Sequence, residues 1–592
     1  MLTAFWLSIA VVSAIPIGKF QAVFNGAEEK GHDEGNFRDL KVGELNFLHT
    51  TDTHGWLGSH LTQANYGADW GDFISFTTKF KERRIGSNDL LLIDTGDKHD
   101  GNGISDATVP NGIRSTEIFN EQDYDLLTLG NHELYTEDNT ILEYYSTVVN
   151  DKFKGKYVAS NVEFVTNESE IVPFGSKYRF FQTSNLRYNI LAFSFLFNFQ
   201  RANSRAIVTP AAEELQKDWF QEVVNSYPEE KVDVIIVFGH MPITDPEEHE
   251  INKVHAILRT YYPNSVIQYF GGHSHIRDFA IFDELSTGLQ SGRFAETVGF
   301  LSIDNVRSEA PRFSRRYIDF NKDSFAHHSG VNFKKDLRTE RGANVSSKIG
   351  EIREELNLTS VVGYVPRSYY MDSKPLTSKK NIYNLLTTNV LPLLKSKKTN
   401  SSKSRFILIN TGSIRYDLYE GEFTKDTEYI VSPFSNDWNF VEIPLALAED
   451  VAAYLNNGAI LMTSMGPPES RMKAELPKRR DSCPFIHTPG FTKGYTTLDD
   501  FGCKGDDKVH NSELYFPVPN VVQSVELQAG WSESVHFVFY SFIQPYVINA
   551  LNALNEEKKV VTYKFSDADC MKYGGKSTGE LLKDYIRSLD KS

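Results

Sequence analysis

Short, largely apolar runs recur along the first half of the chain, and each one ends in a cluster of polar residues. Apolar runs of about four to seven residues are typical of strands that are buried on both faces. The runs are Leu45–Leu48, Leu90–Ile93, Leu126–Leu129, Val232–Phe238 and Val266–Phe270. Stretches of helical character, such as Asp72–Arg84, lie between several of them. This alternation predicts an α/β fold.

Each run is followed by residues whose side chains can bind metal ions. Carboxylates and imidazoles are ligands of zinc, manganese and iron, and ligands of α/β folds bind at the carboxyl ends of strands. In chain order these residues are Asp52 and His54, Asp97, Asn131 and His132, His240, and His273 and His275. Side chains two residues apart in an extended strand end point to the same side, as expected for Asp52 and His54. Asp97 can bridge two ions, because a carboxylate has two oxygens.

Any one of these residues alone has a commoner explanation. An isolated aspartate after a strand is usually a turn former or a helix cap, and an isolated histidine is usually a partly buried core residue. Five such clusters, each at the end of a strand, are difficult to explain in this way. The combined pattern therefore predicts a metal site.

The second half of the chain has a different organisation. A charged stretch, 332–356, has partly helical character and is expected to connect two domains. Another strand, Phe406–Ile409, follows and ends in the sequence NTGSIRYD. Residues 465–515 are rich in proline, glycine and charge, which indicates a long surface excursion. A length of 592 residues also favours two or more domains.

The charge of the chain limits the partners it can have. There are 62 basic and 78 acidic residues, which gives a net charge of −16. Broad, non-specific binding of nucleic acid needs a basic surface, so this class of function is excluded. A small phosphate ester can still bind where metal ions or a few arginines supply local positive charge.

An apolar segment at the start of the chain indicates entry into the secretory pathway. It ends in Val12-Ser13-Ala14, and small residues of this kind are typical of a signal-peptidase site. We expect a signal peptide over 1–14 and a flexible lead-in over 15–42, with a buried N-terminal strand as the alternative for the apolar segment. The segment is shorter than the about 20 residues that span a membrane, so no membrane anchor is expected. The vacuole lumen and the cell exterior both remain possible destinations.

Glycosylation and disulfide chemistry would fit this route. Asn-x-Ser/Thr triplets occur at Asn167, Asn344, Asn357 and Asn400. In an oxidising compartment we expect Cys483 to pair with Cys503, which leaves Cys570 free. The sequence has no Cys-x-x-Cys pair, so a cysteine-based zinc site is not expected.

The polar clusters also resemble the motifs of a known family. The series DTHG, GD…G, GNHE, GH and GHSH resembles the calcineurin-like metallophosphoesterases, and within them the 5′-nucleotidase group. In the second half, Asn410–Arg415 resembles the NxGxxR element of this group and Pro433–Asn436 its PFxN element. The resemblance covers about 44–440. It implies a metallophosphoesterase α/β sandwich over 43–330, a connector over 331–360 and a substrate-binding α/β domain over 361–592.

The resemblance also implies a role for each matching residue. One divalent metal ion (Zn, Mn, Fe or Mg) would be held by Asp52, His54, Asp97 and His275, and a second by Asp97, Asn131, His240 and His273. A hydroxide that bridges the two ions would attack the phosphorus of a phosphate ester, most naturally a nucleotide. His132 would stabilise the transition state. The substrate-binding residues implied by the family motifs are Arg415, Asn410, Phe434 and Asn436.

Three of these substrate assignments have alternatives. Arg415 can pair with phosphate oxygens through its planar guanidinium, although a surface ion pair is the simpler explanation. For Phe434 we favour packing in the core over contact with substrate, and for Asn436 support of the local backbone.

One position departs from the family pattern. In 5′-nucleotidases an aspartate usually follows the catalytic histidine three residues later, and here that position is Tyr135. A tyrosine hydroxyl can orient an imidazole but supplies no negative charge at neutral pH. Either another carboxylate orients His132 or the histidine works without one. His99 and Asp100 are candidates to approach it, whereas Glu133 is expected to point the other way.

The nucleobase site is the second departure. The closest match to the aromatic base clamp of the group is the loose one at Lys493-Gly494-Tyr495. Three functions therefore stay open. They are a nucleotide monophosphatase, a phosphodiesterase of cyclic nucleotides or nucleotide sugars, and a catalytically weak binding protein that retains the fold.

Overall fold

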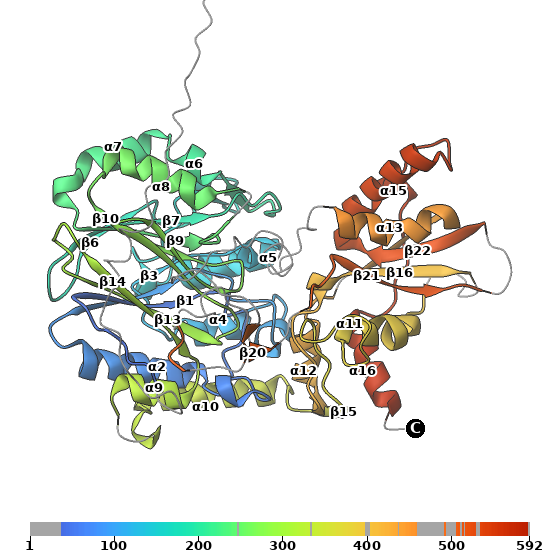
Figure 1. Ribbon diagram of the computed structural model, residues 1–592, viewed down its shortest axis with the longest axis horizontal. Coiled ribbons are helices and arrows are strands. Elements are labelled where there is room, and N and C mark those ends of the chain that lie inside the picture. Colours follow the sequence, from blue (N-terminus) through green and yellow to red (C-terminus); the bar gives the residue numbers. More distant parts are fainter. Residues whose placement is uncertain are drawn as a thin grey trace, which may run out of the picture.

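The computed structural model describes ten segments of the chain, which form two α/β domains (Figure 1). The described residues are 37–245, 248–331, 334–396, 403–435, 437–458, 491–492, 505–508, 512–513, 516–528 and 533–589. Several predicted features lie outside them: the signal peptide 1–14, Asn400, Asn436, Cys483 and Cys503, and Lys493–Tyr495. Among the described residues, no helix is both long and apolar enough to cross a membrane.

Two mixed sheets form the centre of the first domain. The first sheet has the strand order β14-β13-β1-β2-β3, and the second has the order β11-β12-β10-β9-β7-β6. The strands of the first sheet are β1 (Leu45–Thr50), β2 (Asp89–Asp94), β3 (Leu126–Leu127), β13 (Thr297–Asp304) and β14 (Arg312–Asp319). Those of the second are β6 (Arg179–Gln182), β7 (Asn189–Leu196), β9 (Val234–His240), β10 (Val266–Gly271), β11 (Arg277–Asp283) and β12 (Ser286–Ser291). A small third sheet is formed by β4 (Val162–Val165), β5 (Ile171–Pro173) and β8 (Ala206–Val208).

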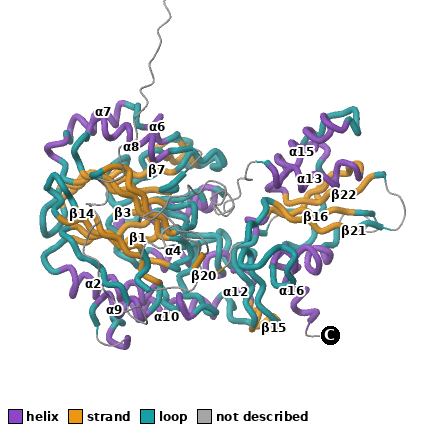
Figure 2. Tube along the Cα trace, in the orientation of Figure 1, coloured by secondary structure: helices purple, strands orange, loops and turns teal. Residues whose placement is uncertain are grey.

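The sheets stack face to face, and helices cover their outer faces (Figures 1 and 2). Side chains from both sheets, such as Phe47 and Phe270, form one buried core between them. One outer layer contains α2 (Trp70–Phe80), α4 (Ile113–Phe119), α9 (Lys322–Ser329) and α10 (Glu340–Glu355), and the other contains α6 (Ala211–Glu214), α7 (Asp218–Ser226) and α8 (Glu250–Tyr261). The α/β fold that the apolar runs predicted is thus confirmed, as is the sandwich that the family resemblance implied.

The predicted strands are confirmed, with one that is shorter than expected. β1, β2 and β3 are parallel to one another, as are β7, β9 and β10, so the polar clusters gather at one edge of the sandwich. β3 ends at Leu127 rather than Leu129, because the chain turns there to bring Gly130 against Asp97. A Cβ atom on Gly130 would lie 2.1 Å from Oδ1 of Asp97, so only glycine allows this approach.

The second domain is built around one five-stranded sheet with the order β21-β16-β22-β18-β23. Its strands are β16 (Arg405–Asn410), β18 (Trp438–Pro444), β21 (Val521–Glu526), β22 (Ser534–Tyr540) and β23 (Met571–Lys572). The helices around it are α11 (Ile382–Leu385), α13 (Leu445–Asn457), α15 (Gln544–Lys558) and α16 (Thr578–Leu589). A pair of strands, β15 (Val361–Val365) and β17 (Gly421–Thr424), and α12 (Lys425–Val431) face the first domain (Figure 1).

Buried ion pairs and hydrogen bonds join the two domains. Arg353 of α10 lies 2.9 Å from Oδ2 of Asp426 in α12, and Oδ1 of the same carboxylate accepts a hydrogen bond from the backbone N–H of Gly103. Farther along the interface, Arg201 donates to the hydroxyl of Tyr546 over 2.7 Å. The charged connector that the sequence predicted therefore contains α10, which packs on the first domain and binds the second.

A short part of the excursion 465–515 is buried in the first domain. The backbone of Asp506 pairs with Tyr317 of β14 in an isolated parallel β-bridge. The carboxylate of Asp506 accepts a hydrogen bond from Arg277. The Oδ2 atom of Asp507 lies 3.0 Å from Nε2 of His328. Both aspartates are buried, so this part is not the exposed surface that its composition predicted. The reason is charge: Arg277 is itself buried, and a buried cation needs carboxylate partners.

The end of the expected lead-in also packs on the first domain. Leu40 is buried in the outer core beside α2 and α9, and the backbone N–H of Arg38 donates to the carbonyl of Asp507.

Tyr416 forms a further contact between the domains, and this contact contains a titratable group. Its hydroxyl lies 2.9 Å from Oε1 of Glu296 and 3.1 Å from Nδ1 of His60 in the first domain. Burial raises the pKa of Glu296 to about 7, although Arg293, Arg277 and the Tyr416 hydrogen bond oppose the shift. Asp417 adds to the increase. His60 stays neutral near pH 7, because burial lowers its pKa to about 4.

We predict that the contact around Glu296 weakens as the pH rises. Glu296 would return to a pKa near 4.5 in water, so between about pH 4.5 and 7 closing the contact takes up a proton. The ratio of protein with the contact closed to protein with it open is therefore highest below pH 4.5. This ratio falls roughly 100-fold as the pH rises through 7. Small-angle X-ray scattering should show a larger radius of gyration at pH 8 than at pH 5.

The Glu296→Gln variant is the control for this prediction. Glutamine keeps an oxygen that accepts from Tyr416 but does not titrate. The difference between the two pH values should therefore disappear. Equal pH dependence in both proteins would show that another group controls the contact.

Candidate metal centre and active site

The polar clusters converge at the edge where the two sheets of the first domain end. Asp52 and His54 follow β1, Asp97 follows β2, His240 is the last residue of β9, and His273 and His275 follow β10. The backbone of this edge is strained. Positive φ angles occur at Asp52 (51°), His54 (46°), Asp97 (58°), His273 (74°) and His275 (61°). Left-handed backbone is costly for residues other than glycine, and such strain concentrates at functional sites.

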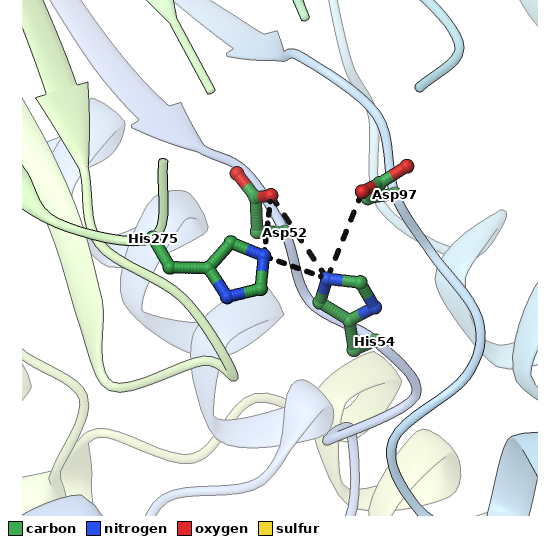
Figure 3. Close-up of side chains that lie close together, drawn as sticks. All are labelled: Asp52, His54, Asp97 and His275. Carbon is green, nitrogen blue, oxygen red and sulfur yellow. Dashed lines mark hydrogen bonds and ion pairs between the residues drawn. The ribbon is translucent and has the colours of Figure 1, made fainter. Parts of the chain in front are cut away.

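Four of these side chains form one compact group (Figure 3). They are Asp52, His54, Asp97 and His275, and one ligand atom from each lies within 4.8 Å of the others. Nε2 of His275 is 3.1 Å from Oδ1 of Asp52 and 3.1 Å from Nε2 of His54. Nε2 of His54 is 3.7 Å from Oδ2 of Asp97. All four side chains are buried, so the cluster is not a chance meeting of surface charges.

A second group shares Asp97 with the first. It consists of Asp97, His240 and His273, again with ligand atoms within 4.8 Å of one another. Nε2 of His240 lies 3.0 Å from Oδ2 of Asp97, so this carboxylate faces both groups. Asn131 belongs to the neighbouring loop, where the backbone N–H of His132 donates to Oδ1 of Asp97 over 2.8 Å. The structure thus brings together every residue that the strand-end pattern selected.

Hydrogen bonds from outside the two groups fix the orientation of the imidazoles. Nδ1 of His54 donates to the carbonyl of His99 over 2.6 Å, and Nδ1 of His240 donates to the carbonyl of Thr95 over 2.8 Å. Both rings therefore present Nε2 to the cluster. Such outer contacts are typical of metal-binding histidines, because they select the tautomer that leaves the other nitrogen free.

The electrostatics of the site favour a bound cation. Burial lowers the pKa of His273 to about 4 and holds the pKa values of His54 and His275 well below the usual range, so these imidazoles are neutral at pH 7. Burial also lowers the pKa of His240, but Asp97 and Asp52 outweigh it and raise the value to about 10. Neutral imidazoles are the form that binds metals, and the field of two carboxylates attracts positive charge.

Unpartnered buried atoms support the same conclusion. Oδ1 of Asn131 and Nδ1 of His273 are buried without a hydrogen-bond partner among the described residues, whereas Oδ2 of Asp97 and Nε2 of His240 lie 3.0 Å from each other. A buried polar atom without a partner costs about 1–3 kcal/mol, so two such atoms beside this pair call for a ligand that binds them. Oxygen and nitrogen donors of these types fit a divalent metal ion.

His132 lies beside the cluster, and a carboxylate contacts its far side. Nε2 of His132 is 3.9 Å from Oδ2 of Asp97, and Nδ1 is 2.6 Å from Oδ2 of Asp100. The side chain of Tyr135 instead accepts a hydrogen bond from the Asn131 amide over 3.1 Å.

Glu133 and His99 point elsewhere. The Glu133 carboxylate accepts hydrogen bonds from the backbone N–H groups of Asp97, Lys98 and Gly130, which ties the two loops together. Nε2 of His99 lies 3.3 Å from Oε1 of Glu133. Of the two candidates that the sequence offered for contact with His132, only Asp100 makes it.

The C-terminal domain contributes Arg415 to this place. The guanidinium is buried, donates through Nη2 to the carbonyl of Asp100 over 3.3 Å, and lies 5.1 Å from the centre of the Phe434 ring. Its Nε and Nη1 atoms have no hydrogen-bond partner among the described residues. Burial lowers the pKa of Arg415 to about 10, so it remains charged at neutral pH. It is therefore not the surface ion pair that we considered.

The other predicted substrate-binding residues are less directly placed. Asn410 is the last residue of β16, and its buried Oδ1 atom has no hydrogen-bond partner in the described part of the chain. Phe434 is half-buried and lies under Arg415. Asn436 lies outside the described residues.

The loop that contains Phe294 belongs to no motif but contacts the predicted metal ligands. Phe294 has a φ of 54°, its ring contacts His54 and His275, and its backbone N–H donates to the carbonyl of Asp52 over 2.7 Å. Sequence reasoning missed this residue, because one phenylalanine among 41 carries no signal of its own. It also missed Glu133 as the link between loops, although the residue lies inside the GNHE motif.

Comparisons with known proteins agree with this architecture. Residues 45–277 match the calcineurin-like phosphoesterase family, and residues 368–548 match the C-terminal domain of NAD nucleotidase. The crystal structure of a 5′-nucleotidase from Candida albicans is 45% identical, with a TM-score of 0.82 over 93% of this chain and 99% of that chain.

Fungal relatives match over nearly the same length. An uncharacterized protein of Saccharomyces cerevisiae is 54% identical over 93% of this chain and 94% of its own length. A protein of Arthroderma benhamiae described as secreted is 36% identical over 92% of this chain and 90% of its own. With this fold, a buried cluster suited to divalent metal ions and these relatives, the chain belongs to the calcineurin-like metallophosphoesterases of the 5′-nucleotidase type, which are metal-dependent phosphoesterases.

Proposed function

We propose that this protein is a two-metal phosphomonoesterase that hydrolyses nucleoside 5′-monophosphates. The observation that carries the proposal is the shared Asp97: its carboxylate faces two groups of buried ligands, and Arg415 from the other domain lies beside them. The similar Candida albicans protein is a 5′-nucleotidase, and this likeness supports the choice of substrate.

Two sets of residues would hold the metal ions. The first set is Asp52, His54, Asp97 and His275, and the second is Asp97, Asn131, His240 and His273. When bound, two divalent ions would neutralise phosphoryl charge. They would also lower the pKa of a water molecule, so that at neutral pH it loses a proton and can attack phosphorus as hydroxide. The strained loops fix the ligand positions in advance, so little reorganisation is required when substrate arrives.

His132 and Arg415 would act on the phosphoryl group from outside the metal ligands. Nε2 of His132 faces the cluster without a hydrogen-bond partner among the described residues, and in the imidazolium form it can donate to a phosphoryl oxygen. Nε and Nη1 of the buried Arg415 likewise have no hydrogen-bond partner within the described part of the chain, and a guanidinium pairs with phosphate oxygens through two parallel hydrogen bonds. Because Arg415 comes from the second domain, the metal site and Arg415 would bind the substrate together only when the domains are closed.

We predict that Asp97→Asn removes both metal ions and lowers turnover on AMP by about 10³-fold or more. The amide has one oxygen instead of two and carries no negative charge, so it cannot serve both groups of ligands. Metal analysis of the purified proteins should find about two ions per chain in the parent and fewer than one in the variant.

Asp304→Asn is the matched control for this substitution. Asp304 ends β13 at the opposite edge of the sheet and forms an exposed ion pair with Arg312, so metal content and turnover should not change. Full turnover by Asp97→Asn would contradict the two-metal proposal. Chelator-sensitive turnover in the parent would also exclude the catalytically weak binding protein.

A phosphodiesterase remains the second candidate for one specific reason. Residues 368–548 match a domain described as the C-terminal domain of NAD nucleotidase. Cyclic nucleotides, nucleotide sugars and dinucleotides would be the substrates of such an enzyme.

We predict that kcat/KM for AMP exceeds that for cyclic AMP, a nucleotide sugar and NAD. A monoester dianion offers three oxygens without a second ester group, and it can bind two cations and Arg415 together. Steady-state kinetics on one purified preparation test this ranking. A higher kcat/KM for any of the three diesters would favour the phosphodiesterase.

We also propose that the protein enters the secretory pathway, to the vacuole lumen or the cell exterior. The apolar segment at 1–14 and the relative described as secreted support this. Three of the glycosylation triplets are exposed at their asparagine: Asn167, Asn344 and Asn357.

We predict that endoglycosidase treatment of the protein purified from fungal cells increases its mobility in gel electrophoresis. Unchanged mobility would contradict glycosylation.

A further inference from the structure

The side chain that orients His132 comes from an unexpected loop. In the pattern that the chain resembles, the partner of this histidine lies three residues later. Residues 132–134 form a single helical turn that ends at Tyr135, so positions 132 and 135 lie on one face. The ring of Tyr135 indeed meets the ring of His132 edge to face, with centroids 5.0 Å apart. The position usual for the carboxylate is thus close to His132 but is filled by a neutral ring.

Asp100 makes the contact that Tyr135 cannot make. Its Oδ2 atom lies 2.6 Å from Nδ1 of His132, and its Oδ1 atom accepts a hydrogen bond from the amide of Asn111 over 2.7 Å. The carboxylate is therefore held on both sides. Burial raises the pKa of Asp100, but its contacts with His132 and His99 outweigh burial and hold the pKa below the usual range. An ionised carboxylate only accepts, so Nδ1 of His132 carries the donated proton.

The backbone of Asp100 connects the same residue to the second domain. Its φ of 68° is in the left-handed region, and its carbonyl accepts the hydrogen bond from Arg415. Asparagine and aspartate tolerate this conformation better than most residues. Asp100 thus contacts both groups that would face the phosphoryl group from outside the metal ligands.

Tyr135 has a different contact. Its hydroxyl accepts a hydrogen bond from Nδ2 of Asn131, which leaves Oδ1 of Asn131 buried and without a hydrogen-bond partner among the described residues. An amide binds a metal ion through its oxygen. The hydroxyl therefore holds the amide in the orientation that presents this oxygen.

We propose that Asp100 positions His132 for catalysis, and that Tyr135 positions Asn131 as a metal ligand. The inference rests on the proposed phosphomonoesterase activity. Asp100 fixes the direction of the imidazole and, as an anion, favours its charged form, in which Nε2 also carries a proton that it can donate to the phosphoryl group. Neither residue touches substrate or metal, so both are positioning residues.

The other carboxylates near His132 have different contacts. Glu133 accepts from three backbone N–H groups. Asp106 accepts from the backbone N–H groups of Gly101 and Asn102. Asp97 is the shared carboxylate of the two groups. Within the described residues, the Oδ2 atom of Asp100 is therefore the carboxylate oxygen in hydrogen-bond contact with Nδ1 of His132.

The first test replaces Asp100 with alanine. We expect kcat on AMP to fall by roughly 10- to 100-fold with little change in KM or in metal content, because orientation of the imidazole acts on the transition state. Asp304→Asn is again the control, since its carboxylate forms an exposed ion pair with Arg312 and its kcat should not change. Thermal unfolding of both variants shows whether the loop has been disrupted.

The second test moves the carboxylate to the usual position. In the Asp100→Ala background, Tyr135→Asp places a carboxylate three residues after His132, on the same face of the turn. We expect this change to restore about tenfold in kcat. A merely structural role of Asp100 would not be rescued from another loop. The assay is run at metal concentrations that saturate both sites, because Tyr135→Asp also removes the hydroxyl that holds Asn131. Failure of the rescue under these conditions would overturn the assignment of Asp100, and so would a kcat of Asp100→Ala equal to that of Asp304→Asn.

The third test separates the role of Tyr135 by a measurement that does not depend on activity. Tyr135→Phe removes only the hydroxyl, and we expect the affinity for the more weakly bound metal ion to fall by about tenfold in a chelator competition. Asp100→Ala should leave this affinity unchanged. Equal metal affinities in Tyr135→Phe and the parent would overturn the assignment of Tyr135. If the metal-loaded parent itself hydrolyses no phosphate ester, the proposed function fails instead.

Discussion

The Asp97 carboxylate is the group on which the arrangement of the site depends. It is completely buried, and a buried carboxylate without partners would cost several kcal/mol. Contacts from several loops offset this cost: the backbone N–H of His132 and the imidazoles of His54 and His240. Burial raises its pKa, but these neighbours outweigh burial and hold it well below the usual range. The same concentration of negative charge and free imidazole nitrogens is what a pair of divalent cations requires.

The loops around Asp97 are held in strained conformations by a small number of hydrogen bonds. Glu133 joins the loop after β2 to the loop after β3 through three backbone N–H groups. The missing Cβ of Gly130 permits their close approach. Strain of this kind persists only where the surrounding structure enforces it, which here is the core between two stacked sheets. The stability of the sandwich thus maintains ligand positions that the loops alone would not adopt.

The second domain completes the site instead of merely adjoining it. Arg415 donates to the carbonyl of Asp100 and the neighbouring Tyr416 donates to Glu296, so two consecutive residues contact two different loops of the first domain. Asp100 lies between His132 and Arg415. In the proposed mechanism, closure of the domains would therefore affect the imidazole of His132 as well as the guanidinium of Arg415.

The amino-acid sequence predicts the fold and the ligand cluster well, for physical reasons. The apolar runs ending at Asp52, Asp97 and His240 are buried strands, and parallel strands must deliver their carboxyl ends to one edge.

Contacts between distant loops were harder to predict, because no periodic pattern encodes them. Asp100 was one of two candidates for the contact with His132, and only its three-dimensional position distinguishes it from His99. The burial of Asp506 depends on Arg277, which lies more than 200 residues earlier in the chain. Phe294 and Glu296 belong to no motif at all.

Anomalous X-ray diffraction from crystals of the metal-loaded protein would show whether Asp97 joins two metal ions. Data collected at the absorption edge of the bound metal locate each ion independently of any assay. We expect two peaks about 3.5–4 Å apart, with the Asp97 carboxylate between them. A single peak, or peaks away from Asp97, would contradict the two-metal site.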